Sequence, residues 1–181
     1  MNQPLNLVAI VGSLRAESFQ RSIFNSADEL AGSDIAISEV SLRDVPFFNE
    51  DLEVDGGPAA VQALNEAVDA ADGLIVFTPE YNGSAPAVTK NAIDWLSRVP
   101  GDSALSRAAV GIVASSPGGH EVAGVRAHLG GSIGANTSRF YETTLGIASI
   151  ADKLTDGRLT DEATRTRLAE WIAGFASHVR I

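Results

Sequence analysis

Residues 73–84 read GLIVFTPEYNGS, and this stretch contains the pattern that decides the fold. Its first five residues form an uninterrupted apolar run, which is typical of a strand buried on both faces of a parallel sheet. The run then passes into Thr, Pro, Glu, Tyr, Asn, Gly and Ser. A buried strand needs no such polar ending for its own stability. Residues 78–84 are therefore predicted to hold a flat, polar ligand.

Apolar strand-like runs and helix-like patterns alternate along the rest of the chain. Strands are predicted over residues 5–11, 35–42, 73–78, 108–115 and 138–145. Helices are predicted after an N-cap at Ser18, over residues 61–71, 85–99 and 120–129, and from 160 to near the C-terminus. This alternation indicates an open α/β sheet of parallel strands with helices on both faces. Because 181 residues suffice for one sizeable core and no linker or repeat is visible, a single domain over residues 1–181 is expected.

The composition excludes several functional classes. A net charge of −10 argues against non-specific nucleic-acid binding, which requires a surplus of Lys and Arg. With no cysteine, the chain has no thiolate nucleophile or iron–sulfur ligand, and three scattered histidines predict no metal site. No apolar run reaches the roughly 20 residues of a membrane span, and the N-terminus lacks a signal-peptide pattern. We therefore expect a cytoplasmic protein without a membrane partner.

The loop after the first predicted strand combines donors that suit an anion. Ligands bind beyond the carboxyl ends of parallel strands, and residues 12–20 (GSLRAESFQ) lead from such an end into a helix N-terminus. Backbone amides there, the hydroxyls of Ser13 and Ser18, and the cation of Arg15 could together hold a phosphate. The triphosphate motif GK[ST] and the dinucleotide motif GxGxxG are both absent, so a monophosphate fits better. The alternative is an ordinary strand–helix turn with a serine cap.

Two further strand ends carry the loops 78–84 and 115–119, which should lie beside the first loop. Backbone groups of residues 80–83 could bond the edge of a planar heteroaromatic ring, with Tyr81 in contact with the ring. Glu80 has no titratable neighbour in sequence with which to form an acid–base pair, so no general-base role is assigned to it. The alternative for residues 78–84 is a structured turn before a helix. The Gly-rich loop 115–119 is a weak signal by itself.

These segments closely resemble those of the NADPH-dependent FMN reductase family, which includes flavin, quinone, azo-dye and chromate reductases. The resemblance is carried by GSLR with Ser18, by PFFNED (residues 46–51), and by PEYNGS leading into KNAIDW (residues 79–95). It extends in order and spacing from Leu5 to the C-terminal helix. It implies a flavodoxin-like three-layer sandwich with strand order 2-1-3-4-5, bound FMN, NADPH or NADH as co-substrate, and a homodimer or homotetramer.

The resemblance also implies which residues contact FMN. The phosphate would be held by Ser13, Arg15, Ser18, the amide of Phe19, and Gln20. The isoalloxazine would be lined by Pro79, Glu80, Tyr81, Asn82 and Gly83, and approached from the third loop by Ser115, Gly118 and Gly119. Gln20 stands where the family commonly has Asn, so its longer amide must reach the phosphate differently. No catalytic residue is predicted, because the cofactor carries the chemistry.

The predicted function is hydride transfer from NAD(P)H to bound FMN and on to a small-molecule acceptor: a flavin, quinone, azo compound or metal oxyanion. One alternative is a flavodoxin-like carrier that passes single electrons to protein partners without NAD(P)H activity. A second is a sugar- or nucleotide-phosphate binding domain without redox chemistry. Tyr81, Trp95 and the pair Phe47–Phe48 are candidates for an apolar subunit interface near the flavin, with the protein core as the alternative place for Trp95.

Overall fold

The computed structural model describes residues 4–99 and 101–181, so residues 1–3 and 100 of the expected domain lie outside the described residues. Five parallel strands form a sheet in the order β2-β1-β3-β4-β5, which confirms the expected flavodoxin-like topology. The strands are β1 (Leu5–Val11), β2 (Ile35–Glu39), β3 (Gly73–Pro79), β4 (Val110–Ser115) and β5 (Leu145–Ile147). Val11 is opposite Phe77 and Pro79 is opposite Ser115, so these strands end at one edge.

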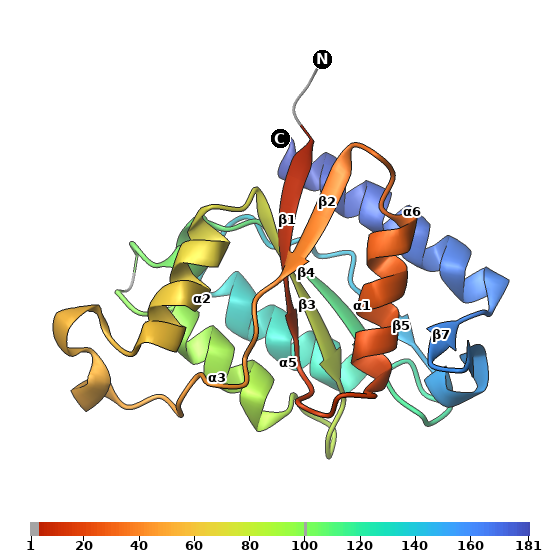
Figure 1. Cartoon of the computed structure of the whole chain (residues 1–181), viewed down its shortest axis with the longest axis horizontal. Coiled ribbons are helices and arrows are strands. Elements are labelled where there is room, and N and C mark those ends of the chain that lie inside the picture. The colour runs from red at the N-terminus through yellow and green to blue at the C-terminus, as the bar shows by residue number, and fades with distance from the viewer. Residues whose placement is uncertain (1–3, 100) are drawn as a thin grey trace.

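Helices cover both faces of the sheet, as Figure 1 shows. One face packs against α1 (Phe19–Leu30) and α6 (Glu162–Val179). The other face packs against α2 (Ala59–Asp69), α3 (Ala87–Leu96), α4 (Ala104–Arg107) and α5 (Ala123–Gly134). Side chains alternate across each strand, so Ile75 and Phe77 enter the first core while Leu74 and Val76 enter the second. This two-sided burial is the reason why the central strands are apolar throughout.

Two glycines in the sheet let α6 pack closely. A Cβ at Gly111 would lie 2.8 Å from the Trp171 ring, and a Cβ at Gly73 would lie 2.9 Å from Val179. Trp171 also anchors the helix through its indole Nε1, which donates to the carbonyl oxygen of Thr143 at 2.6 Å. The first core therefore depends on a close contact between backbone and aromatic rings that larger strand residues would prevent.

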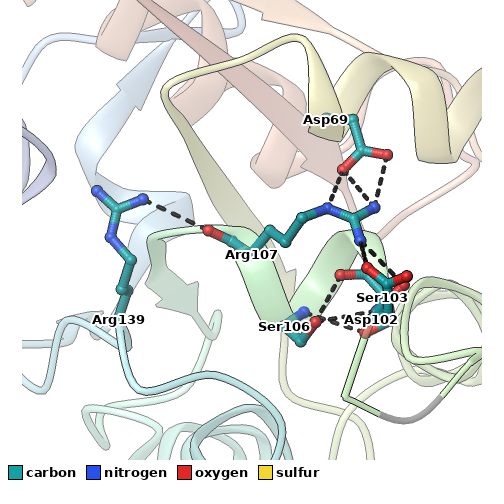
Figure 2. Close-up of polar contacts among 6 residues, drawn as sticks. All are labelled: Asp69, Asp102, Ser103, Ser106, Arg107 and Arg139. Atoms are coloured by element: carbon teal, nitrogen blue, oxygen red, sulfur yellow. Dashed lines mark hydrogen bonds and ion pairs between the residues drawn. The ribbon is translucent and has the colours of Figure 1, made fainter.

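Arg107 fixes the segment that precedes β4 (Figure 2). Its Nη2 donates to Asp69 Oδ1 at 2.8 Å, and its Nη1 donates to Asp102 Oδ1 at 2.6 Å. These contacts, with the Asp69 hydrogen bond as the largest, raise the pKa of Arg107. Ser103 and Ser106 cap the short helix reciprocally. Helix α4 is not predicted from the sequence, because four residues are too few to show a helical period.

The last predicted strand was misplaced. Residues 138–144 run beside the start of β4, where the Tyr141 amide donates to the Val110 carbonyl oxygen at 2.8 Å. They form only an isolated bridge there, and the strand itself is Leu145–Ile147. The apolar pair Phe140–Tyr141 therefore produced a strand-like pattern in a connecting segment that follows the edge of the sheet.

Other boundaries differ by less. The helix predicted over 120–129 is Ala123–Gly134, the helix predicted over 85–99 is Ala87–Leu96, and the strand predicted over 35–42 ends at Glu39. The predicted start of the last helix is close, because Asp161 caps it. Elements not predicted are the hairpin β6 (Leu154–Thr155) with β7 (Arg158–Leu159), and the 3-10 helices Glu50–Leu52, Val54–Gly56 and Ile150–Lys153.

The start of the first strand and the candidate ligand loops lie at opposite ends of the sheet. The start of β1 and the end of α6 lie at one end, and the loops that follow β1 and β3 lie at the opposite end (Figure 1). Across residues 4–99 and 101–181, no helix has the length and apolar character that crossing a membrane requires. The three polar loops singled out in the sequence all follow strands that end at the same edge.

Candidate cofactor site

The loop after β1 leaves its backbone donors unpartnered. The chain turns at Gly12, whose amide donates to the Phe77 carbonyl oxygen at 2.7 Å. A Cβ at Gly12 would lie 2.1 Å from Thr89 Oγ1, so glycine allows the turn to lie against α3. For the amides of residues 13–17, no hydrogen-bond acceptor is present in the described part of the chain. These donors are consequently available to a ligand.

The helix that follows adds further donors. Ser18 is the N-cap of α1, as predicted, and its Oγ accepts from the Arg21 amide at 3.2 Å. The Ser18 hydroxyl can still donate its own hydrogen, and the first-turn amides of a helix, including that of Phe19, lack acceptors within the helix. Arg15 is exposed, with its guanidinium carbon 5.6 Å from the centre of the Phe19 ring. Amides, a hydroxyl and a cation thus surround the N-terminus of α1.

Gln20 joins the first loop to the third. Its side chain is 1% exposed, and Nε2 donates to Ser115 Oγ at 2.5 Å. Its Oε1 is buried and has no hydrogen-bond partner among the described residues. Buried polar atoms are rarely left unpaired, so the atom indicates a missing partner at this junction. Because an amide can rotate to exchange its oxygen and nitrogen, Gln20 can direct either an acceptor or a donor toward that partner.

The loop after β3 is a tight two-residue turn. Tyr81 and Ser84 exchange backbone hydrogen bonds of 2.9 and 3.0 Å, and Asn82 and Gly83 between them have φ angles of 52° and 76°. Two positive φ angles define a type I′ turn, for which Asn-Gly is the preferred pair. The amides of Asn82 and Gly83 have no acceptor within the described chain, and Tyr81 is 55% exposed. The turn therefore presents backbone donors and an aromatic ring to solvent.

Glu80 is engaged with other parts of the protein. Its amide donates to the Ser115 carbonyl oxygen at 3.3 Å, and Pro79 before it is the last residue of β3. Its carboxylate is only 12% exposed, with Oε2 accepting from the Val125 amide at 3.1 Å and Oε1 3.7 Å from His120 Nδ1. These contacts leave the carbonyl oxygen of Glu80 as its backbone group available to a ligand. The capping of α5 by Glu80 was not anticipated from the sequence, because the two segments are far apart along the chain.

The third loop is partly fixed and partly open. The Gly118 amide donates to Ser116 Oγ at 3.0 Å, and the Gly118 carbonyl oxygen accepts from the Ser149 amide at 2.7 Å. Gly119 is exposed, and a Cβ placed on it would meet no atom within 4 Å. Gly118 is therefore part of a bonded turn, whereas the backbone at Gly119 is open to a ligand.

The three loops together fit FMN. The contacts Gln20–Ser115 and Glu80–Ser115 bring the ends of β1, β3 and β4 together, as the parallel register requires. A dianionic phosphate would satisfy the free amides of residues 13–17 beside Arg15. A planar ring with polar edges would match the open backbone groups at 82–83. The residues present thus suit a ligand with a phosphate at one end and a heteroaromatic ring at the other.

Comparison with known proteins decides the family. Residues 5–143 match the family model described as NADPH-dependent FMN reductase. The chain belongs to this family. It is 35% identical to a quinone reductase of Pseudomonas putida, with 100% of this chain and 98% of the relative covered. It is 36% identical to an NAD(P)H:quinone oxidoreductase of Solanum tuberosum, with 92% and 89% covered.

A solved structure agrees with this assignment. FerB, a flavoenzyme NAD(P)H:(acceptor) oxidoreductase from Paracoccus denitrificans, superposes with a TM-score of 0.85 at 28% identity, covering 97% of each chain. The protein is thus an oxidoreductase of an FMN-dependent, NAD(P)H-dependent family, and the predicted enzyme class, cofactor and fold are confirmed.

One polar residue of this reductase was quoted in the sequence motif without a role. Asn91 is 7% exposed, its Nδ2 donates to the Pro46 carbonyl oxygen at 2.9 Å, and its Oδ1 accepts from the Phe48 amide at 2.7 Å. Trp95 Nε1 donates to the same Pro46 oxygen at 2.8 Å. The sequence signal for this contact is the side-chain amide of Asn91 among apolar positions of a helix. It indicates a buried bonding partner, although it does not identify which segment provides it.

The aromatic residues near this reductase's site are divided between the core and the surface. Trp95 is 1% exposed and packs edge-on against Phe48, with ring centres 4.9 Å apart. Of the two places predicted for Trp95, the structure confirms the protein core, since its ring is covered by its own chain. Phe47, in contrast, is 76% exposed. Of the suggested interface aromatics, Phe47 and Tyr81 are the exposed members.

Proposed function

We propose that this reductase transfers a hydride from NAD(P)H to bound FMN and from there to a small-molecule acceptor, which is the chemistry that FMN supplies when bound. The observation that carries the proposal is the set of unpartnered amides over residues 13–17 beside Arg15, because such a site suits the phosphate of FMN. Relatives named quinone reductase favour a quinone as acceptor. Flavins, azo compounds and metal oxyanions are the other acceptors in the proposal.

The protein's own residues would bind and orient the cofactor. In this proposal the phosphate is held by Ser13, Arg15, Ser18, the Phe19 amide and Gln20. The ring is lined by Pro79, Glu80, Tyr81, Asn82 and Gly83 from the second loop, and by Ser115, Gly118 and Gly119 from the third. The roles differ within these sets: Asn82, Gly83 and Gly119 offer open backbone, whereas Ser115 and Glu80 hold the loops together. No side chain of the chain is required as nucleophile.

The assembly is also part of the proposal. We propose a single cytoplasmic domain that forms a homodimer or homotetramer, with Phe47 and Tyr81 at or near a subunit contact. Both rings are large and exposed, at 76% and 55%, and aromatic residues are enriched in subunit interfaces.

The absorbance spectrum of the purified protein, reconstituted with FMN, tests the function. We expect a bound flavin spectrum that NADH or NADPH bleaches under anaerobic conditions and that a quinone restores. A bound flavin that NAD(P)H does not reduce would favour a single-electron carrier instead. Purified protein that binds no FMN, or that fails to oxidise NAD(P)H with any quinone, flavin or ferricyanide, would contradict the proposal.

A further inference from the structure

Helix α5 begins without a cap of its own. Its N-cap residue is Val122, whose side chain accepts no hydrogen bond and whose φ of 49° lies in the left-handed region. A β-branched residue rarely adopts that conformation, and Val122 is completely buried. The first-turn amides of such a helix need acceptors from elsewhere. The Val125 amide finds one in Glu80 Oε2, at 3.1 Å.

The carboxylate of Glu80 is placed well for this task. It is 12% exposed, so solvent competes weakly for it, and a negative charge at a helix N-terminus is stabilised by the helix dipole. Its second oxygen lies 3.7 Å from Nδ1 of His120, which follows the third loop. One side chain therefore contacts both the first turn of α5 and the segment that leads into it.

Two further contacts show that the loop after β3 and α5 are fitted to each other. A Cβ on Gly124 would lie 3.0 Å from the Gly83 carbonyl oxygen and 3.4 Å from Glu80 Oε2, so a larger residue there would push the two segments slightly apart. Ser84 Oγ lies 2.7 Å from His128 Nδ1, one turn further along the helix. The type I′ turn is thus bonded to α5 on both sides of its two central residues, Asn82 and Gly83.

We propose that Glu80 is a positioning residue, whose carboxylate caps α5 and so fixes the spacing between the second and third loops of the flavin site. The inference rests on the proposed function, because the spacing matters only if both loops contact one ligand. The open groups at 82–83 and at Gly119 belong to different walls of the site. A ring held between two walls needs both at once, so a small shift of either weakens binding.

The test compares Glu80→Ala with Glu80→Gln, since the Gln side-chain oxygen can still accept from the Val125 amide. In Glu80→Ala we expect the dissociation constants of FMN and of riboflavin to rise together by about five- to thirtyfold, the ratio that loss of one cap gives. Both ligands should respond because the loops contact the ring and not the phosphate. Glu80→Gln should remain within about threefold of wild type. Glu170→Ala, at an exposed position on α6, is the matched control.

Hydrogen exchange of the protein without flavin gives a readout that is independent of activity. The amide of Val125 should exchange faster in Glu80→Ala than in wild type, and Glu80→Gln should restore its protection. A second variant, Gly124→Ala, should displace the Gly83 carbonyl and weaken both flavins without removing any charge. It keeps the helix intact, because alanine is the better helix former.

The outcomes separate this inference from the proposed function. Unchanged flavin affinity in Glu80→Ala, or unchanged exchange at Val125, overturns the positioning role while the proposed function stands. A selective loss of FMN with normal riboflavin binding also overturns it, because Glu80 would then act on the phosphate. A wild-type protein that binds neither flavin overturns the proposed function and the role of Glu80 in flavin binding with it. The inference is supported if Glu80→Ala loses affinity for FMN and for riboflavin to a similar extent and Glu80→Gln restores both affinities.

Discussion

The loops after β1 and β2 both follow strands of the same sheet, but their polar groups are used in opposite ways. The amides of residues 13–17 have no acceptor in the described chain. The loop 46–57 is instead bonded to α3 and to the residues just after it. Asn91 and Trp95 of α3 bind its backbone, and Arg98, which follows the helix, binds its Glu53. The comparison teaches that polar composition does not distinguish a ligand loop from a scaffold loop. The distinction lies in whether the protein itself satisfies the backbone donors.

Arg98 shows how completely the loop 46–57 is bound. Its Nη2 donates to Glu53 Oε2 at 3.0 Å, and its guanidinium lies over the Phe48 ring at 4.9 Å. The hydrogen bond to Arg98 is the main reason why the pKa of Glu53 is lowered. These side chains hold the loop to the end of α3 without any ligand. Substitutions in the loop after β1 should therefore lower flavin affinity more than stability. Substitutions that release the loop 46–57 should lower stability more than flavin affinity.

The largest expected effect follows from the double variant Arg15→Ala with Ser18→Ala in the first loop. The variant removes a cation and a hydroxyl that would bind the FMN phosphate. The FMN dissociation constant should rise on the order of 100-fold, as the loss of two charge-assisted hydrogen bonds predicts. Riboflavin, which lacks the phosphate, should bind within about threefold of wild type. Flavin fluorescence quenching measures both constants. Arg158→Ala with Ser177→Ala, at exposed positions, is the control, and unchanged FMN affinity in the first variant would show that the phosphate lies elsewhere.

An intermediate effect, on stability instead of flavin affinity, is expected from Asn91→Ala, which removes the α3 side chain that binds the loop 46–57. The substitution leaves the half-buried Phe48 amide without its acceptor, so the free energy of unfolding should fall by about 1–3 kcal/mol. FMN affinity of the folded protein should change by less than about threefold. Urea unfolding followed by fluorescence measures the stability, with the exposed Asn25→Ala as control. A loss of FMN affinity without a loss of stability would instead place the loop 46–57 in the cofactor site.

The smallest effect concerns the pH dependence of the stability that Glu53 gives to the loop 46–57. The pKa of Glu53 in the folded protein lies below its usual value of 4.5, so the pair with Arg98 stabilises the fold above that value. This stabilisation is lost as the pH falls through the folded pKa, while Arg98 stays charged. Glu53→Gln should therefore unfold at a slightly lower temperature than wild type at pH 7, with the gap closing in acid. Because the pair is at the surface, added salt should also narrow the gap, and a gap independent of pH would contradict the ion-pair account.

Most of the sheet could be predicted because its strands are buried on both faces. Runs such as residues 5–11 and 73–78 are apolar at nearly every position, which few other structures require. The strand Leu145–Ile147 was missed because three residues carry too little pattern, while Phe140 and Tyr141 pack beside the sheet outside any strand. Short elements that tertiary contacts stabilise, such as α4, cannot be predicted from local periodicity for the same reason.

The site could be predicted at the level of segments but not of individual contacts. The Ser18 cap and the Asn82-Gly83 turn follow from local residue preferences, and both are present. The partners of Glu80, Asn91 and Gln20 could not be predicted, because each of them is at least 35 residues away along the chain. Such contacts depend on how the layers meet. A single sequence records that a polar residue is present and says nothing of its distant partner.

The unpartnered amides of residues 13–17 bear on which positions of this loop can tolerate substitution. Where a site consists of backbone groups, the positions of its donors depend on the backbone conformation and not on the identity of the exposed side chains. Leu14, Ala16 and Glu17 all point to solvent in the described loop. Substitutions at these positions should therefore keep the donors of the proposed phosphate site, whereas substitutions at Gly12 and Ser18, which fix the path at either end, should displace them.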